Sequence, residues 1–123
     1  MAEHIDFGKK AENFAVDFLE KNGYKILERN FRFQKAEIDI IAENTDKIII
    51  VEVKARASNH FINPEEAVNK KKMRLLLLAT NRFLEIRNIE KEVRFDIISL
   101  LQNPKGDFSV NHIENAFDIV DIQ

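Results

Sequence analysis

The sequence predicts one α/β domain, residues 1–123, in which helices flank a mixed five-stranded sheet. Apolar residues recur at helical spacing in two segments, and runs of strand length rich in apolar residues occupy several others. The expected order is helix, three strands, helix, two strands. At 123 residues and 45% hydrophobic content, the chain is long and apolar enough to form a single core.

The first helix is expected to begin after Asp6, which can cap it, and to end near Gly23. Glu12 lies at the edge of its buried face. It is therefore either a boundary residue or a third carboxylate directed at the strands that follow. The apolar residues that recur at helical spacing are Phe7, Ala11, Phe14, Ala15 and Phe18.

Residues 24–33 are the expected first strand. Within it, Arg29 and Arg32 alternate with phenylalanines. Interleaved Arg and Phe can line a phosphate-facing rim or stack on bases. Phenylalanines at alternate strand positions are more often part of the core, so both interpretations stay open.

A β-hairpin is predicted by two isoleucine- and valine-rich runs, residues 37–42 and 47–54, on either side of a short polar break. If Thr45 and Asp46 are the central turn residues, counting back along the strands sets two pairs of residues opposite each other. These pairs are Asp39 with Glu52 and Glu37 with Lys54.

Directly opposed residues have Cβ atoms about 4.5–5.5 Å apart. Asp39 and Glu52 therefore repel unless a positive charge lies between them, and an oxygen-preferring cation such as Mg²⁺ would supply it. Lys54 would then be placed to handle an anionic substrate or a water molecule. The alternative is a hairpin with a simply solvated polar face, on which Glu37 and Lys54 form a cross-strand ion pair.

The second half of the chain begins with an expected loop, residues 55–60. A helix should follow from Asn63, the expected N-cap, with Pro64 in its first turn, to about Ile86. Lys72 falls on the apolar series of this helix, so its ammonium group either extends to water or lies near an anion. Strands are expected at residues 92–101 and 108–113, and the tail from 114 to 123 has no assigned structure.

The net charge of −2 counts against binding of nucleic acid by bulk electrostatics. Basic residues nevertheless cluster on both sides of the acidic hairpin, where they form either a phosphate-facing rim or only a solvated face. The chain has no cysteine, no signal-peptide pattern and no apolar run long enough to span a bilayer, so we expect a cytoplasmic protein that does not enter membranes. The three histidines lack the spacing of metal ligands. The basic residues on the two sides of the hairpin are Lys25, Arg29, Arg32 and Lys35 before it, and Lys70, Lys71, Lys72 and Arg74 after it.

The order of Glu12, Asp39 and Glu52-Val53-Lys54 resembles the restriction-endonuclease-like nuclease core, known by the motif PD-(D/E)xK. More closely, nearly the whole chain resembles the YraN-like family of small bacterial proteins. That family usually has glycine where this chain has Ala11 and Ala36. The matching stretches are Gly8 with Glu12 and Ala15, Gly23-Tyr24, Arg29 to Arg32, Glu37 to Ala42, Val51 to Arg56, Pro64 with Ala67-Val68 and Lys72, Arg94 to Asp96, and His112 to Phe117.

The resemblance implies a restriction-endonuclease-like fold and a bound Mg²⁺ or Mn²⁺. Asp39, Glu52 and a main-chain carbonyl near Val53 would hold the ion, and Glu12 would reach it directly or through water. Lys54 would orient the attacking water or stabilise the transition state. The implied supporting or nucleic-acid-binding residues are Glu37, Arg56, Lys72, Arg29 and Arg32.

Two functions are compatible with this resemblance. The first is a metal-dependent nuclease for branched or damaged DNA, because the motif order is similar to that of archaeal Holliday junction resolvases, which act as dimers. The second is a non-catalytic module that keeps the fold and binds nucleic acid or protein. DNA and a second copy of the chain are the expected partners of the nuclease.

Overall fold

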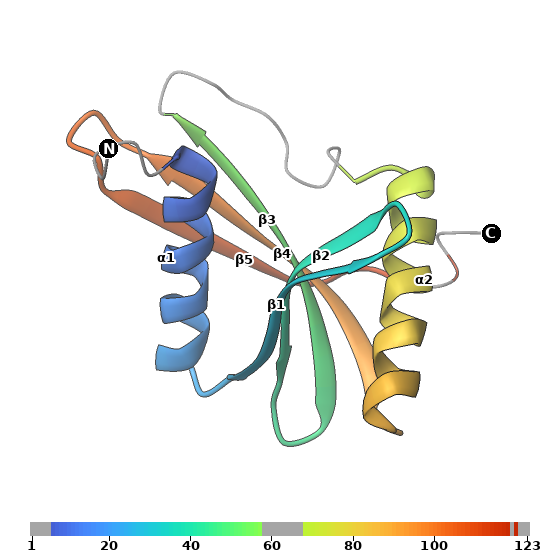
Figure 1. Ribbon diagram of the computed structural model, residues 1–123. Coiled ribbons are helices and arrows are strands. Elements are labelled where there is room, and N and C mark those ends of the chain that lie inside the picture. The colour runs from blue at the N-terminus through green and yellow to red at the C-terminus, as the bar shows by residue number, and fades with distance from the viewer. Residues whose placement is uncertain (1–5, 58–67, 119, 121–123) are drawn as a thin grey trace.

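The computed structural model describes residues 6–57, 68–118 and 120. These residues form an α/β domain in which a five-stranded mixed sheet lies between two helices (Figure 1). The predicted fold class and element order are therefore confirmed. The elements are α1 (Phe7–Lys21), β1 (Lys25–Phe33), β2 (Ala36–Glu43), β3 (Lys47–Ala57), α2 (Lys70–Arg87), β4 (Glu92–Gln102) and β5 (Phe108–Phe117).

The strands lie in the sheet in their chain order, from β1 to β5. Neighbouring strands are antiparallel except β3 and β4, which run parallel and are separated in the chain by α2. This parallel pair requires a crossover connection, which accounts for the helix between the three antiparallel strands β1 to β3 and the hairpin of β4 and β5. The hairpin of β2 and β3 therefore lies well inside the sheet.

The two faces of the sheet carry separate apolar cores, one under each helix. Ala11 and Ala15 are fully buried, and these small side chains let α1 pack closely on its face. Ala36 is buried on the opposite face, under α2. The methyl groups of Ala11 and Ala36 thus fill core space, and neither residue has a positive φ that would require glycine.

The ends of α1 are those expected from the sequence. Asp6 caps the helix by accepting a hydrogen bond from Lys9 N–H at 2.8 Å. After the helix, Gly23 adopts a φ of +89°, a left-handed conformation that glycine reaches without strain. Among the described residues, no helix is long and apolar enough to cross a membrane.

The second helix was predicted to run from Asn63, but the structure shows that residues 68 and 69, the first described residues of that segment, are not helical. Asn69 has extended backbone angles (φ −89°, ψ 177°) and caps α2 by accepting a hydrogen bond from Lys72 N–H at 2.9 Å. A continuous helix cannot pass through a residue in this conformation. Asparagine is a preferred cap at either site, but the helix begins after the second one. Asn63 and Pro64 lie outside the described residues.

Two strands extend beyond their predicted ends. β3 continues through Ala57, where a loop was expected, because it stays paired with β4 as far as Gln102. β5 continues to Phe117, whose ring stacks on Phe95 with centroids 4.9 Å apart. Pairing with a neighbouring strand and burial of an aromatic ring therefore extend both strands past their local sequence signals.

Candidate functional site

The register of the central hairpin is the one predicted. Asn44 N–H donates to Lys47 C=O at 3.1 Å, so Thr45 and Asp46 are the central turn residues. The Asn44 side chain accepts hydrogen bonds from the main-chain N–H groups of Asp46 and Lys47, at 2.9 and 2.8 Å, which fixes the turn. The paired ladder ends at Ile40 and Val51. Asp39 and Glu52 follow directly at the same end of the hairpin.

Asp39 lies beside Glu52 in a largely buried position. Burial first, and the neighbouring Glu52 carboxylate second, raise the pKa of Asp39 from 3.8 to about 7. The N–H of Val53 donates to Asp39 Oδ2 at 2.9 Å and fixes the direction of the carboxyl group. Two acidic side chains from adjacent strands therefore meet, and one of them is partly protonated at neutral pH.

Glu52 is only 3% exposed and contacts two ammonium groups through one oxygen. Its Oε2 lies 3.0 Å from Lys72 Nζ and 3.4 Å from Lys54 Nζ. Its Oε1 is buried and has no hydrogen-bond partner. Burial, the largest single influence, would lower the pKa of Lys72, but its contact with Glu52 and the nearby acidic charges leave that pKa raised.

A cavity of about 350 Å³ opens next to Asp39, between α1, β2 and β3. It brings together five predicted site residues: Glu12, Glu37, Asp39, Lys54 and Arg56. The other predicted residues, Glu52, Lys72, Arg29 and Arg32, do not line it. Glu52 joins the site through Asp39 and Lys54, and Lys72 joins it through Glu52. A mainly apolar cavity of about 400 Å³ lies away from these residues, between α2, β4 and β5.

Glu12 lies in the wall of this cavity but is engaged by β1. Its Oε1 accepts hydrogen bonds from Arg29 at 2.7 and 3.0 Å and from Asn30 Nδ2 at 3.0 Å. Asn30 has a φ of +53°, which breaks the regular strand and turns its side chain to Glu12. Within residues 6–57, 68–118 and 120, no three His, Asp or Glu side chains gather as a metal-binding group. Only Asp39 and Glu52 of the three predicted ligands come together.

The ion pair between Glu37 and Lys54, which belonged to the alternative interpretation of the hairpin, does not form between these described residues. Lys54 contacts Glu52, which shares its strand, while Glu37 pairs with Arg32 across β1 and β2 at 3.4 Å. The Arg32 side chain is 75% exposed, so solvent reaches its guanidinium group beside Glu37. Phe31 packs against Phe83 with ring centroids 5.3 Å apart. Of the two interpretations of this Arg and Phe segment, the core interpretation therefore holds for Phe31.

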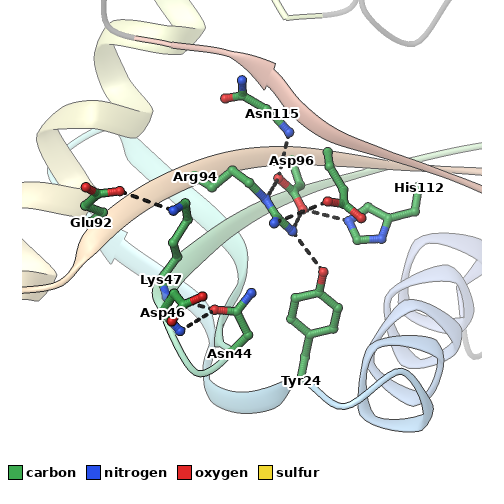
Figure 2. A network of polar contacts seen from close by, with 10 residues as sticks. Tyr24, Asn44, Asp46, Lys47, Glu92, Arg94, Asp96, His112 and Asn115 are labelled. Atoms are coloured by element: carbon green, nitrogen blue, oxygen red, sulfur yellow. Dashed lines mark hydrogen bonds and ion pairs between the residues drawn. The ribbon is translucent and has the colours of Figure 1, made fainter.

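A second buried polar cluster, centred on Asp96, was not predicted (Figure 2). Both Asp96 oxygens accept from Arg94, at 2.8 and 2.9 Å, and they also contact His112 Nε2 at 2.7 Å and Asn115 N–H at 3.0 Å. Burial would raise the pKa of Asp96, but these hydrogen bonds together lower it. Arg94 also donates to the Tyr24 hydroxyl at 2.9 Å. The cluster thus ties the start of β1 to β4 and β5.

The alternating residue pattern of β4 contained a sequence signal for the Asp96 cluster. Arg94 and Asp96 share one side of the strand with Ile98 and Leu100, which the structure buries under α1. Two opposite charges in a buried row require partners. The partner His112 could not be identified from spacing, because it lies on a different strand.

The acidic pair has the chemistry of a divalent-cation site. Asp39 and Glu52 supply carboxylate oxygens, the donors that Mg²⁺ and Mn²⁺ prefer. Glu52 Oε1 is buried without a partner, and such an atom carries a desolvation cost that a bound cation would remove. The residues present therefore fit an ion held by Asp39 and Glu52, and Glu12 lines the same cavity as Asp39.

Fold and site together define a small α/β protein with a buried acidic pair beside a polar cavity on a mixed sheet. The chain belongs to the uncharacterised protein family UPF0102, the YraN-like family, whose model matches residues 11–100. It is similar to a UPF0102 protein of Flavobacterium psychrophilum, with 47% identity over 95% of this chain and 98% of the relative. UPF0102 proteins of Christiangramia forsetii (44% identity, 95% and 98% covered) and Persephonella marina (46%, 91% and 93%) are similar to it as well.

Proposed function

We propose that this protein is a metal-dependent nuclease that hydrolyses phosphodiester bonds in DNA. The observation that carries the proposal is the meeting of Asp39 and Glu52, from adjacent strands, beside a cavity that Asp39 and Lys54 both line. The similarity of these residues, in order and type, to the restriction-endonuclease-like core supports the same conclusion. Fold alone would not, because one fold hosts many activities.

In this proposal Asp39 and Glu52 hold Mg²⁺ or Mn²⁺. An ion held there would supply a water of lowered pKa and would polarise a phosphoryl oxygen. Val53 N–H keeps the Asp39 carboxyl group directed at the site through its 2.9 Å hydrogen bond. Lys54 lines the cavity and donates to the phosphate oxygens, so that it stabilises the negative charge that develops as the bond breaks.

The substrate we propose is branched or damaged DNA, cut by a pair of chains. This rests on the similarity of the motif order to that of archaeal junction resolvases. In this proposal Arg56, in the cavity wall, and the exposed Arg32 contact phosphates near the site. Arg29, in contrast, is held by Glu12 and Asn13, so its first role is to fix the cavity wall.

The test is cleavage of labelled linear, nicked, flapped and four-way DNA in Mg²⁺ or Mn²⁺. We expect cleavage of a branched substrate that disappears without the metal, in Asp39→Ala and in Lys54→Ala. Glu20→Ala, an exposed change on α1, serves as the matched control and should keep full activity. Folded wild-type protein that cuts none of these substrates would overturn the proposal.

A second candidate is a non-catalytic module that binds nucleic acid or protein. It is favoured by the engagement of Glu12 with Arg29 and Asn30, which removes one predicted ligand from the acidic pair. The net charge of −2 points the same way. Genetic complementation separates the two functions. A nuclease loses its cellular function in Asp39→Ala, whereas a binding module keeps it.

A further inference from the structure

Lys72 occupies an unusual position for a lysine. It lies in the first turn of α2, which contains no acidic residue. The helix dipole disfavours positive charge at this end. The Lys72 ammonium group nevertheless lies 3.0 Å from Glu52 Oε2, closer than that of Lys54 at 3.4 Å. Lys72 of α2 therefore contacts Glu52 of β3 although the helix N-terminus disfavours its charge, which indicates that the acidic pair attracts the Lys72 ammonium group.

The two ammonium groups leave one oxygen of Glu52 unpaired. Both approach the same Glu52 oxygen, Oε2, and the other oxygen is buried without a partner. A divalent cation that binds Oε1 would lie next to these ammonium groups and repel them. Lys54 is fixed on β3 beside the cavity. Lys72 comes from a helix, has a long flexible stem and is 37% exposed, so it can withdraw into solvent.

We infer that Lys72 is a built-in counter-ion that holds the metal-free site together and is displaced when a divalent cation binds. The inference rests on the proposed function, because it assigns the cation to Asp39 and Glu52. It adds regulation to that site, since the lysine competes with the metal for Glu52. The competition sets the cation concentration at which the site becomes loaded.

The test is calorimetric titration of the full chain with Mn²⁺ alone, comparing wild type with Lys72→Gln. Glutamine can still donate to Glu52 but carries no charge. We expect Lys72→Gln to bind Mn²⁺ about three- to tenfold more tightly, because the loss of a competing charge lowers the cost of loading. Lys72→Arg keeps the charge and should bind like wild type. The matched control is Lys71→Gln, which removes a charge from the exposed neighbour and should change affinity less than about twofold.

A thermal melt without metal provides a second readout. Lys72→Gln should melt at a lower temperature than wild type, and this loss should shrink when Glu52→Gln is also present, because the pair is then already broken. Lys72→Met repeats the titration if the glutamine variant does not fold.

The outcomes separate this inference from the proposed function. If wild type binds Mn²⁺ and Asp39→Ala does not, but Lys72→Gln binds with unchanged or weaker affinity, the counter-ion role is overturned and the metal site stands. If wild type binds no Mn²⁺, both are overturned. If the metal binds as expected but no DNA is cut, the counter-ion role stands and the nuclease activity is overturned.

Discussion

Asp39 must lose its proton beside a second carboxylate, and this makes it the residue on which the site depends most. Burial and the charge of Glu52 raise its pKa to about 7, whereas an unfolded chain releases this proton near 3.8. Between these values the folded protein binds a proton that the unfolded chain has released. The contribution of Asp39 to stability is therefore complete below pH 3.8 and is lost as the pH rises through about 7.

Asp39→Asn should consequently stabilise the metal-free protein above pH 7. The amide keeps an acceptor for Val53 N–H and removes the repulsion with Glu52. We expect a gain of about 1–3 kcal/mol in the free energy of unfolding at pH 8, and none at pH 4. Urea denaturation at both pH values measures it. The control is Asp17→Asn, which changes an exposed carboxylate of α1 and should show no such gain. An Asp39→Asn variant that is less stable than wild type at pH 8 would contradict the proposed repulsion.

Asp96 shows the opposite behaviour, because its partners favour the charged form. Its lowered pKa contributes stability above the unfolded value, and this is lost as the pH falls through the folded value. Asp96→Asn leaves the largely buried Arg94 without its counter-charge and should cost about 3–5 kcal/mol of unfolding free energy in urea denaturation at pH 7. Glu114→Gln removes the exposed partner of Arg94 and should cost less than about 1 kcal/mol. Equal losses in the two variants would exclude a special role for Asp96.

At the scale of elements, the start of α2 decides where Lys72 lies. Asn69 caps the helix through Lys72 N–H, so the cap and the lysine that contacts Glu52 belong to the same turn. The sequence offers two asparagines with capping chemistry, Asn63 and Asn69, and the local signal of Pro64 favours Asn63, whereas α2 begins after Asn69. β3 presents a similar limit, since its last residues are held by pairing with β4, far along the chain.

Asn69→Ala should lower the free energy of unfolding by about 1 kcal/mol, because Lys72 N–H loses its acceptor. Asn69→Asp keeps an acceptor and adds a negative charge at the helix N-terminus, so it should be as stable as wild type or slightly more stable. Thermal denaturation of both variants checks this. A destabilised aspartate variant would show that the asparagine acts through something other than the cap.

For the whole molecule, local patterns predicted the element order, the hairpin register and the opposition of Asp39 and Glu52. These depend on alternation and on one short turn, which neighbouring residues determine. The Asp96 cluster could not be assembled in the same way. It joins Tyr24, Arg94 and His112 from three distant segments, and only the folded sheet brings them together (Figure 2).

The placement of the helices also depends on the folded sheet and not on local sequence. α1 and α2 cover opposite faces of the sheet (Figure 1), so Glu12 reaches the cavity from one side and Lys72 reaches Glu52 from the other. The periodicity of each helix indicates its buried face but does not indicate which side of the sheet it covers. This arrangement also explains why Glu12 and Glu52 do not join into one group.

Calorimetric titration of the wild-type protein with Mn²⁺, alongside Asp39→Ala and Glu52→Gln, tests the acidic pair as a cation site most directly. The wild-type protein should bind a single ion per chain, and neither variant should bind it, although both remain folded. Binding that persists unchanged in both variants, or no binding by the wild-type protein, would contradict the assignment of the metal to Asp39 and Glu52.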